Sequence, residues 1–266
     1  MFSQNSLETG KKAYDNGEFH QAISFLEAAH MKNPSDKIAR DYLGQSYAQL
    51  GLWEQSAKVY EKLREDFPRE AEFHFKYGGT LGMLAKESNS VTALSKLGDI
   101  KFHLKKALKL DPNHIEARWA LLQLYLELPA IVGGSVRTSR EYASQLKSIS
   151  PVDGALAYGY IERELENYDK AEVHYKKSVE LGRSVTTYKE LAELYKRSGS
   201  ETKCLNILEE GIEILNSIVL ASVYTNYALK LNRSEPEILE ILDSLNMSDL
   251  TSEEKKKLIQ IKTQLN

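Results

Sequence analysis

The sequence predicts an all-α fold, in which short antiparallel helix pairs stack into a right-handed superhelical solenoid. Two observations carry the prediction: proline recurs at intervals near 34 residues, and small and aromatic residues recur in phase with it. The composition is globular, with 42% hydrophobic and 27% charged residues. We expect one domain over residues 1–266, with about six repeats over 3–216, followed by degenerate helices and a cap over 217–266.

Prolines mark the repeat length. Pro34 and Pro68 lie 34 residues apart, Pro112 follows after 44 residues and Pro151 after another 39. A period of about 34 residues corresponds to one pair of helices. Each helix is too short to be stable alone, so each must bury an apolar stripe against its neighbours. The two longer intervals indicate insertions into the third and fourth repeats.

Residues within the intervals support the helix pairs. The first two repeats share a phase, shown by Gly10, Gly17, Phe19, Ala22, Ala29 and Pro34, and by Leu43, Gly44, Tyr47, Gly51, Trp53, Tyr60 and Pro68. This pattern resembles the tetratricopeptide repeat family, which places a small residue where two helices cross and an aromatic residue beside it. The looser later repeats stay in phase as far as Leu208. Cys204 stands where the family usually has alanine, so we expect a buried thiol rather than a reactive one.

The third hairpin and the carboxyl end depart from the regular repeat. Extra residues around Lys86–Ser90 should lengthen both helices of the third hairpin by about 7–8 Å each. Ser234–Glu237 and Thr251–Glu254 each have the pattern of a capping box, which marks a helix start. The last helix places Leu258, Ile261 and Leu265 on one face, and this predicts a capping helix. Its lysines at 255–257 are interpreted as a solvated outer face rather than as a site for an acidic partner.

The second insertion contains the segment Leu128–Ser135. It resembles a Pro-Gly-Ile-Val-Gly-Gly-Ser loop of an uncharacterised bacterial subset of tetratricopeptide proteins, with Ala130 in place of the first glycine. Two interpretations remain open. Gly133, Gly134 and Ser135 would present free amides to an anion or ligand, or they form a turn that requires positive φ followed by a helix cap, which we favour.

No motif indicates catalysis or a cofactor. The six histidines lack metal-ligand spacing, the single cysteine excludes a disulfide within the chain, and no phosphate-binding or nucleophile motif occurs. We therefore predict a non-enzymatic protein without cofactor or metal. The net charge of −3 argues against nucleic acid as a partner. No apolar run approaches the ~18 residues that would span a bilayer.

The family geometry places one face of each first helix on a concave groove. The groove residues expected to contact a partner are Tyr14, Gln45, Gln49, Phe75, Gly79, Gly82, Trp119, Gln123, Tyr160 and Arg163. Two glycines inside one helix cost roughly 1 kcal/mol each against alanine, which suggests a steric need for space. Phe75 and Trp119 could equally complete the core.

The resulting hypothesis is a scaffold that binds a peptide or partner protein in its groove, as a monomer or weak homodimer. The alternative is a small-ligand-binding or catalytic protein that uses a central pocket beside the 129–135 loop. A closed pocket joining groove and loop would favour the alternative, and an open channel the scaffold. We expect a soluble, cytoplasmic protein, or a periplasmic or exported one if a leader has been removed.

Overall fold

The computed structural model describes residues 2–265, with side chains described from Ser6, and this part of the chain is helical without a β-strand. The chain divides into two compact units, residues 1–135 and 136–266. The first contains α1 (Phe2–Asp15), α2 (Phe19–Lys32), α3 (Lys37–Gln49), α4 (Trp53–Asp66), α5 (Ala71–Glu87), α6 (Ser90–Leu110), α7 (Ile115–Glu127) and the 3₁₀ turn η1 (Ala130–Val132). The all-α prediction is confirmed, and the single continuous domain stays a prediction.

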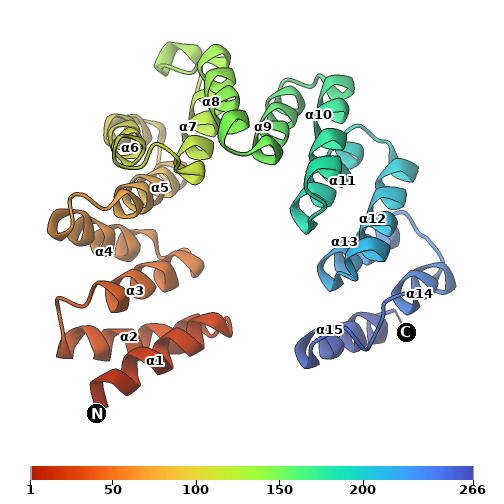
Figure 1. Ribbon diagram of the computed structural model, residues 1–266, viewed down its shortest axis with the longest axis horizontal. Helices are drawn as coiled ribbons and strands as arrows, with labels where there is room; N and C mark the ends of the chain where they lie inside the picture. Colours follow the sequence, from red (N-terminus) through yellow and green to blue (C-terminus); the bar gives the residue numbers. More distant parts are fainter. Residues whose placement is uncertain (1, 266) are drawn as a thin grey trace. The chain divides into compact units, whose positions relative to one another are not determined.

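The second unit continues the alternation of helices and short turns. It contains α8 (Val136–Ile149), α9 (Pro151–Glu164), α10 (Tyr168–Leu181), α11 (Val185–Arg197), α12 (Glu201–Leu215), α13 (Ile218–Lys230), α14 (Glu235–Asp243) and α15 (Ser252–Thr263). Neighbours in the chain pack against each other in both units: α1 against α2, α3 against α4, α5 against α6, α9 against α10, and α11 against α12 (Figure 1).

Close helix crossings follow the predicted pairing of small and aromatic residues. A Cβ atom added at Gly44 would lie only 2.7 Å from Cζ of Tyr60, and one at Gly159 only 2.8 Å from the Tyr175 ring. Both tyrosines are fully buried. Glycine therefore lets two helices of a hairpin approach until the aromatic ring fills the space between them.

Helix ends follow the predicted caps. Ser234 and Thr251 each form a capping box with the glutamate three residues later, at the starts of α14 and α15. The last helix, α15, buries Leu258 and Ile261 and leaves Lys256 and Lys257 exposed. The predicted capping helix is thus confirmed, and the lysines lie on a solvated face.

The third hairpin is elongated as predicted, although the extra length is shared unequally. The α5 helix has 17 residues and α6 has 21, against 13 or 14 in each of α1–α4. The side chain of Asn89 accepts a hydrogen bond from the Thr92 amide at 3.0 Å, which starts α6 at Ser90. Because this cap fixes the turn early, most of the insertion lengthens α6.

Candidate functional site

The elongated hairpin and α7 line a partly open cavity of about 500 Å³ in the first unit, which we call the α5–α7 cavity. From α5 come Phe75, Gly78, Gly79, Gly82, Met83, Ala85 and Lys86; from α6, Ala93, Leu97, Ile100 and Leu104; and from α7, Ala120, Gln123, Leu124, Glu127 and the following Leu128. The α5 members recur at helical spacing, so one face of α5 forms a wall of the cavity.

Two glycines of α5 open onto free space. A Cβ atom added at Gly79 or Gly82 would meet no atom within 4 Å. At the neighbouring Gly78 it would lie 3.2 Å from Cγ of Leu104 and 3.3 Å from Cβ of His103. Gly78 therefore serves the packing of α5 on α6, whereas Gly79 and Gly82 leave room in the cavity.

Polar groups lie among the lining residues of α5 and α7. Nζ of Lys86 lies 3.1 Å from Oε2 of Glu127, so an exposed ion pair links α5 to α7. Gln123, one turn before Glu127, is also exposed. Aliphatic and aromatic side chains supply most of the remaining lining, and this arrangement of an apolar interior with few polar groups is typical of a binding pocket.

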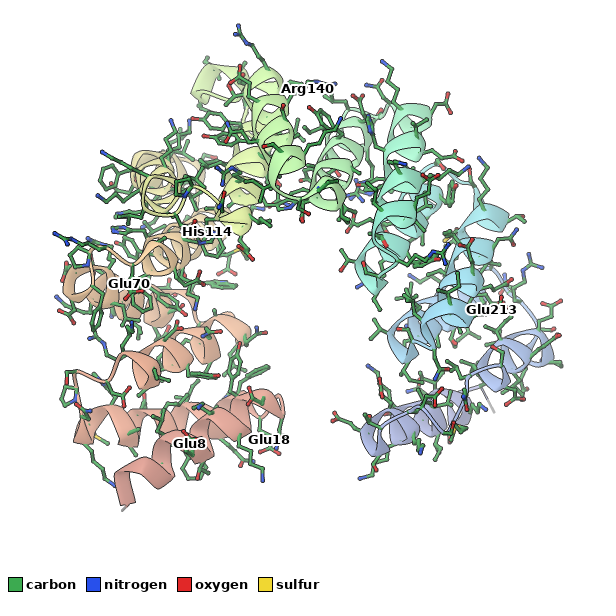
Figure 2. The ribbon with its side chains drawn as sticks, viewed as in Figure 1. Glu8, Glu18, Glu70, His114, Arg140 and Glu213 are labelled. Carbon is green, nitrogen blue, oxygen red and sulfur yellow. The ribbon has the colours of Figure 1, made fainter. Side chains whose placement is uncertain are left out.

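A charged network crosses the first helices of three successive hairpins. Nζ of Lys76 contacts Oδ1 and Oδ2 of Asp41 at 2.8 and 3.0 Å, and Oε1 of Glu72 at 3.3 Å. Glu72 in turn lies 3.3 Å from Nε2 of His114, the residue labelled in Figure 2 that caps α7. This close contact lowers the pKa of the Glu72 carboxyl and raises the pKa of His114. The ring of Phe75 packs on His114 with centroids 4.9 Å apart.

The remaining predicted groove residues of the first unit do not line this cavity. The Tyr14 hydroxyl donates to Oε1 of Gln45 at 3.3 Å, which links α1 to α3, and Gln49 is exposed at the end of α3. Trp119 is half-buried on α7, one turn before Gln123. Of the ten predicted residues, the structure brings Phe75, Gly79, Gly82 and Gln123 together at one cavity.

Arg163 and Tyr160 lie on α9 of the second unit. Although arginine is a common interface residue, Arg163 is buried, and its Nη1 lies 2.6 Å from Oε2 of Glu190. Its guanidinium also packs over the rings of Tyr160 and Tyr175, 5.3 and 5.5 Å from their centroids. The positive charge of Arg163 is therefore paired with Glu190 and stacked on two aromatic rings within the second unit.

The Gly-Gly-Ser loop donates its amides within the chain. The amides of Gly133, Gly134 and Ser135 reach the carbonyls of Ala130, Pro129 and Tyr125 at 3.0, 3.0 and 2.7 Å. Gly133 has a φ of 90°, and a Cβ atom at Gly134 would lie 1.7 Å from the Leu128 carbonyl oxygen. The hydrogen bonds therefore favour the structural turn over an anion site. The cavity lining ends at Leu128 and does not include these three residues.

The sequence prediction did not anticipate a buried histidine pair between α5 and α6. Nδ1 of His74 lies 3.1 Å from Nδ1 of His103, with the rings stacked 5.3 Å apart. Nε2 of His74 lies 3.2 Å from the carbonyl oxygen of Pro68. Burial lowers the pKa of both rings, and that of His103, with Arg64 nearby, falls to about 4. Both rings are therefore neutral at pH 7, and one of the two Nδ1 atoms must donate to the other.

Residues 2–265 contain neither a cluster of metal ligands nor a helix that could cross a membrane. No three histidine, cysteine, aspartate or glutamate side chains of these residues converge as metal ligands would. None of the described helices combines the length and the apolar character needed to cross a membrane.

Comparison with known proteins places this geometry in a family context. The family model of the tetratricopeptide repeat matches residues 13–74, which span α2, α3 and α4. The fold is that of a tetratricopeptide repeat protein. No curated protein matches this sequence.

Solved structures resemble the chain over two thirds or more of its length. A tetratricopeptide repeat protein from Parabacteroides merdae is 16% identical, with a TM-score of 0.55 and 98% of each chain covered. PilW, a type IV pilus biogenesis factor, is 14% identical, with a TM-score of 0.58 and 81% of this chain and 94% of its own covered. A double mutant of MamA is 15% identical, with a TM-score of 0.52 and coverage of 67% and 93%. At these identities the likeness concerns the fold alone.

The sequence prediction missed the contribution of α6 to the cavity. The groove was expected from first helices only, yet Ala93, Leu97, Ile100 and Leu104 of the second helix form one side. The signal was present in the helical spacing of apolar residues within the extended hairpin. Placing them against α7 required knowing that the insertion lengthens α6 more than α5.

Proposed function

We propose that the chain is a non-catalytic interaction scaffold, and that the α5–α7 cavity receives apolar side chains of a peptide or partner protein. The observation that carries the proposal is the open space over Gly79 and Gly82 inside an otherwise apolar cavity. Helix interiors disfavour glycine, so two open glycines that pack against nothing in their own fold support a role in accepting a guest side chain.

The cavity chemistry favours a large aliphatic or aromatic guest. Phe75, Met83, Leu97 and Leu124 provide apolar contact surface, and methionine adapts to guests of different shape. Full burial of a leucine-sized side chain contributes about 1.5–3 kcal/mol. The cavity volume of about 500 Å³ lies within the usual range of ligand pockets.

The polar residues favour an orientation for the partner. Gln123 offers both a hydrogen-bond donor and an acceptor, and Lys86 and Glu127 offer one charge of each sign. A partner helix would therefore place apolar residues three or four positions apart into the cavity, and polar residues against these groups. Binding of this kind needs no cofactor and makes or breaks no covalent bond.

The experiment begins with selection of peptides from a displayed random library against the whole chain, followed by calorimetry on the enriched sequences. The test variant is Gly79→Leu, which fills the cavity with a side chain from its own wall. The matched control is Gly98→Leu on α6, because Gly98 is also a helical glycine with open space around its Cβ position but does not line the cavity.

We expect Gly79→Leu to weaken peptide binding by about tenfold or more, which corresponds to ~1.4 kcal/mol or more, and Gly98→Leu to leave it unchanged. Retained tryptophan fluorescence and helical circular dichroism establish that both variants fold. Equal affinity of the two folded variants for the selected peptides would contradict the proposed site.

A further inference from the structure

The outer face of α6, opposite its buried residues, carries exposed apolar side chains. Ile100, His103, Leu104 and Ala107 form the buried side. On the other side, Val91 is 79% exposed and Phe102 60% exposed. These two side chains point in nearly the same direction, since eleven residues make slightly more than three full turns, and they lie about 16 Å apart along the helix.

The same helix concentrates positive charge. It contains five lysines and a single acidic residue, Asp99, in a chain whose net charge is −3. Among the residues that the structure describes, no carboxylate lies within ion-pair distance of any of the five. Elsewhere in the same unit, Lys37, Lys76 and Lys86 are paired with carboxylates, whereas the scattered Lys12, Lys32 and Lys58 have no ion pair among the described residues. The α6 lysines are Lys96, Lys101, Lys105, Lys106 and Lys109.

The 129–135 loop adds a third apolar group to this surface. Ile131 is 94% exposed at the turn η1. Nζ of Lys101 would lie 3.0 Å from a Cβ atom at Gly133, so the loop and α6 are in contact. Lys101 and Lys105 both lie over the ring of Tyr125, at 5.0 and 5.8 Å from its centroid. Ile131 and the lysines therefore belong to one basic, apolar surface.

We propose that this surface, formed by Val91, Phe102, Ile131 and the α6 lysines, binds peripherally to an anionic lipid bilayer. Unpaired lysines are stabilised by attraction to anionic headgroups. Exposed apolar side chains are stabilised when they enter the interface between headgroups and acyl chains. The chain remains on the surface and does not span the bilayer.

The shape of the apolar groups favours lipid over an acidic protein. Val91, Phe102 and Ile131 are separate, highly exposed side chains rather than the lining of a groove. A protein partner would need a matching pocket for each, whereas a fluid interface accommodates separate protruding side chains without one. Lysine stems extend along apolar surface while the ammonium group stays in water, which suits the same interface.

The first experiment measures cosedimentation of the whole chain with vesicles of phosphatidylcholine alone, or of phosphatidylcholine with about one-third phosphatidylglycerol. The test variant combines Lys101→Gln, Lys105→Gln and Lys109→Gln. The matched control combines Lys12→Gln, Lys32→Gln and Lys58→Gln, which removes the same charge from exposed lysines of α1, α2 and α4.

We expect binding to the anionic vesicles at low salt, with no binding to phosphatidylcholine alone. Three lysines near the surface should together change the partition coefficient by about a hundredfold. The α6 variant should lose that factor, whereas the control variant should bind like the unmodified chain.

The second experiment places a reporter at the loop. Cys204 is only 1% exposed, and burial raises the pKa of its thiol to about 11. A cysteine introduced by Ile131→Cys can therefore be labelled selectively with an environment-sensitive fluorophore. The dye should shift to the blue on anionic vesicles, whereas a dye at Met31→Cys, an exposed apolar position on α2, should not shift.

Three results would overturn the proposal: no binding to anionic vesicles at low salt, equal loss in the α6 variant and its charge-matched control, or no dye shift at position 131 on bound chain. Preferential binding to a soluble acidic polypeptide with no vesicle binding would assign the surface to a protein partner instead. A dimer that Phe102→Ser dissociates, again without vesicle binding, would assign it to a second copy of the chain.

Discussion

Alanine substitutions at Gly78, Gly79 and Gly98 test whether the α5–α7 cavity is open space. Gly79→Ala adds a methyl group that meets nothing within 4 Å, and Gly98→Ala does the same on the outer face of α6. Each should gain the helix-propensity difference between glycine and alanine, about 0.5–1 kcal/mol. At Gly78 the added methyl lies 3.2 Å from Leu104 and 3.3 Å from His103, so crowding should cancel part or all of the gain.

Urea unfolding followed by tryptophan fluorescence is the appropriate assay. The chain has two tryptophans, Trp53 and Trp119, and both lie in the first unit, so the signal reports the unit that contains the cavity. An unchanged slope with a higher midpoint would establish a gain in stability rather than a change in the unfolded state.

A destabilised Gly79→Ala would refute the reasoning, because it would mean that a neighbouring helix needs the space above Gly79. Equal gains at Gly78 and Gly79 would also contradict it, since the two positions differ by the contacts of one methyl group. Gly44→Ala provides the opposite extreme. Its methyl would lie 2.7 Å from the buried ring of Tyr60, and we expect a loss of about 1–3 kcal/mol.

Three further predictions follow from the charged and buried groups. Because burial depresses the pKa of His103 to about 4, the unfolded chain takes up a proton more readily than the folded one, so stability is highest above pH 6.5 and is lost as the pH falls toward 4. His103→Gln should flatten this dependence in urea titrations between pH 7 and 4.5, and an unchanged slope would contradict the argument. The raised pKa of His114 has the opposite effect on the pH dependence of stability, and it does so in both the unmodified chain and His103→Gln. The difference between the two pH profiles therefore reports the contribution of His103. The Cys204 thiol should resist a thiol reagent at pH 8 until the chain unfolds, and rapid reaction of the native chain would disprove its burial. Peptides with an acidic carboxyl-terminal tail should not bind at Lys11 and Lys76 of the first helices, because Lys11 is paired with Glu8, and Lys76 with Asp41 and Glu72; micromolar affinity in calorimetry that Lys76→Gln abolishes would overturn this.

Features that depend on local sequence could be predicted well. The capping boxes at Ser234 and Thr251 need only residues three positions apart. Gly44 and the Tyr60 ring that packs on it lie within one hairpin, and Gly159 and Tyr175 have the same spacing in another hairpin. A repeat pattern is therefore sufficient to find such pairs. The elongated third hairpin follows from the proline intervals, because extra residues between two paired helices can only extend or interrupt them.

Features that depend on contacts between distant helices were harder to predict. The sequence places Arg163 on the groove but does not predict its partner, Glu190 of α11, because 27 residues separate the two in the sequence. The α6 wall of the cavity depends on where Asn89 starts the helix, and the His74–His103 pair depends on the resulting register of α5 against α6. Such registers are set by tertiary packing rather than by the spacing of residues along one helix.

The methyl signals of the methionines test the central claim of a side-chain-binding cavity most directly. Met83 lines the cavity, whereas Met31 and Met247 are exposed elsewhere. In a chain labelled with ¹³C-methyl methionine, a selected peptide should shift the Met83 resonance in a saturable way and leave those of Met31 and Met247 in place, with Met83→Leu used to assign the signal. Saturable binding of the peptide with an unmoved Met83 resonance would contradict the claim.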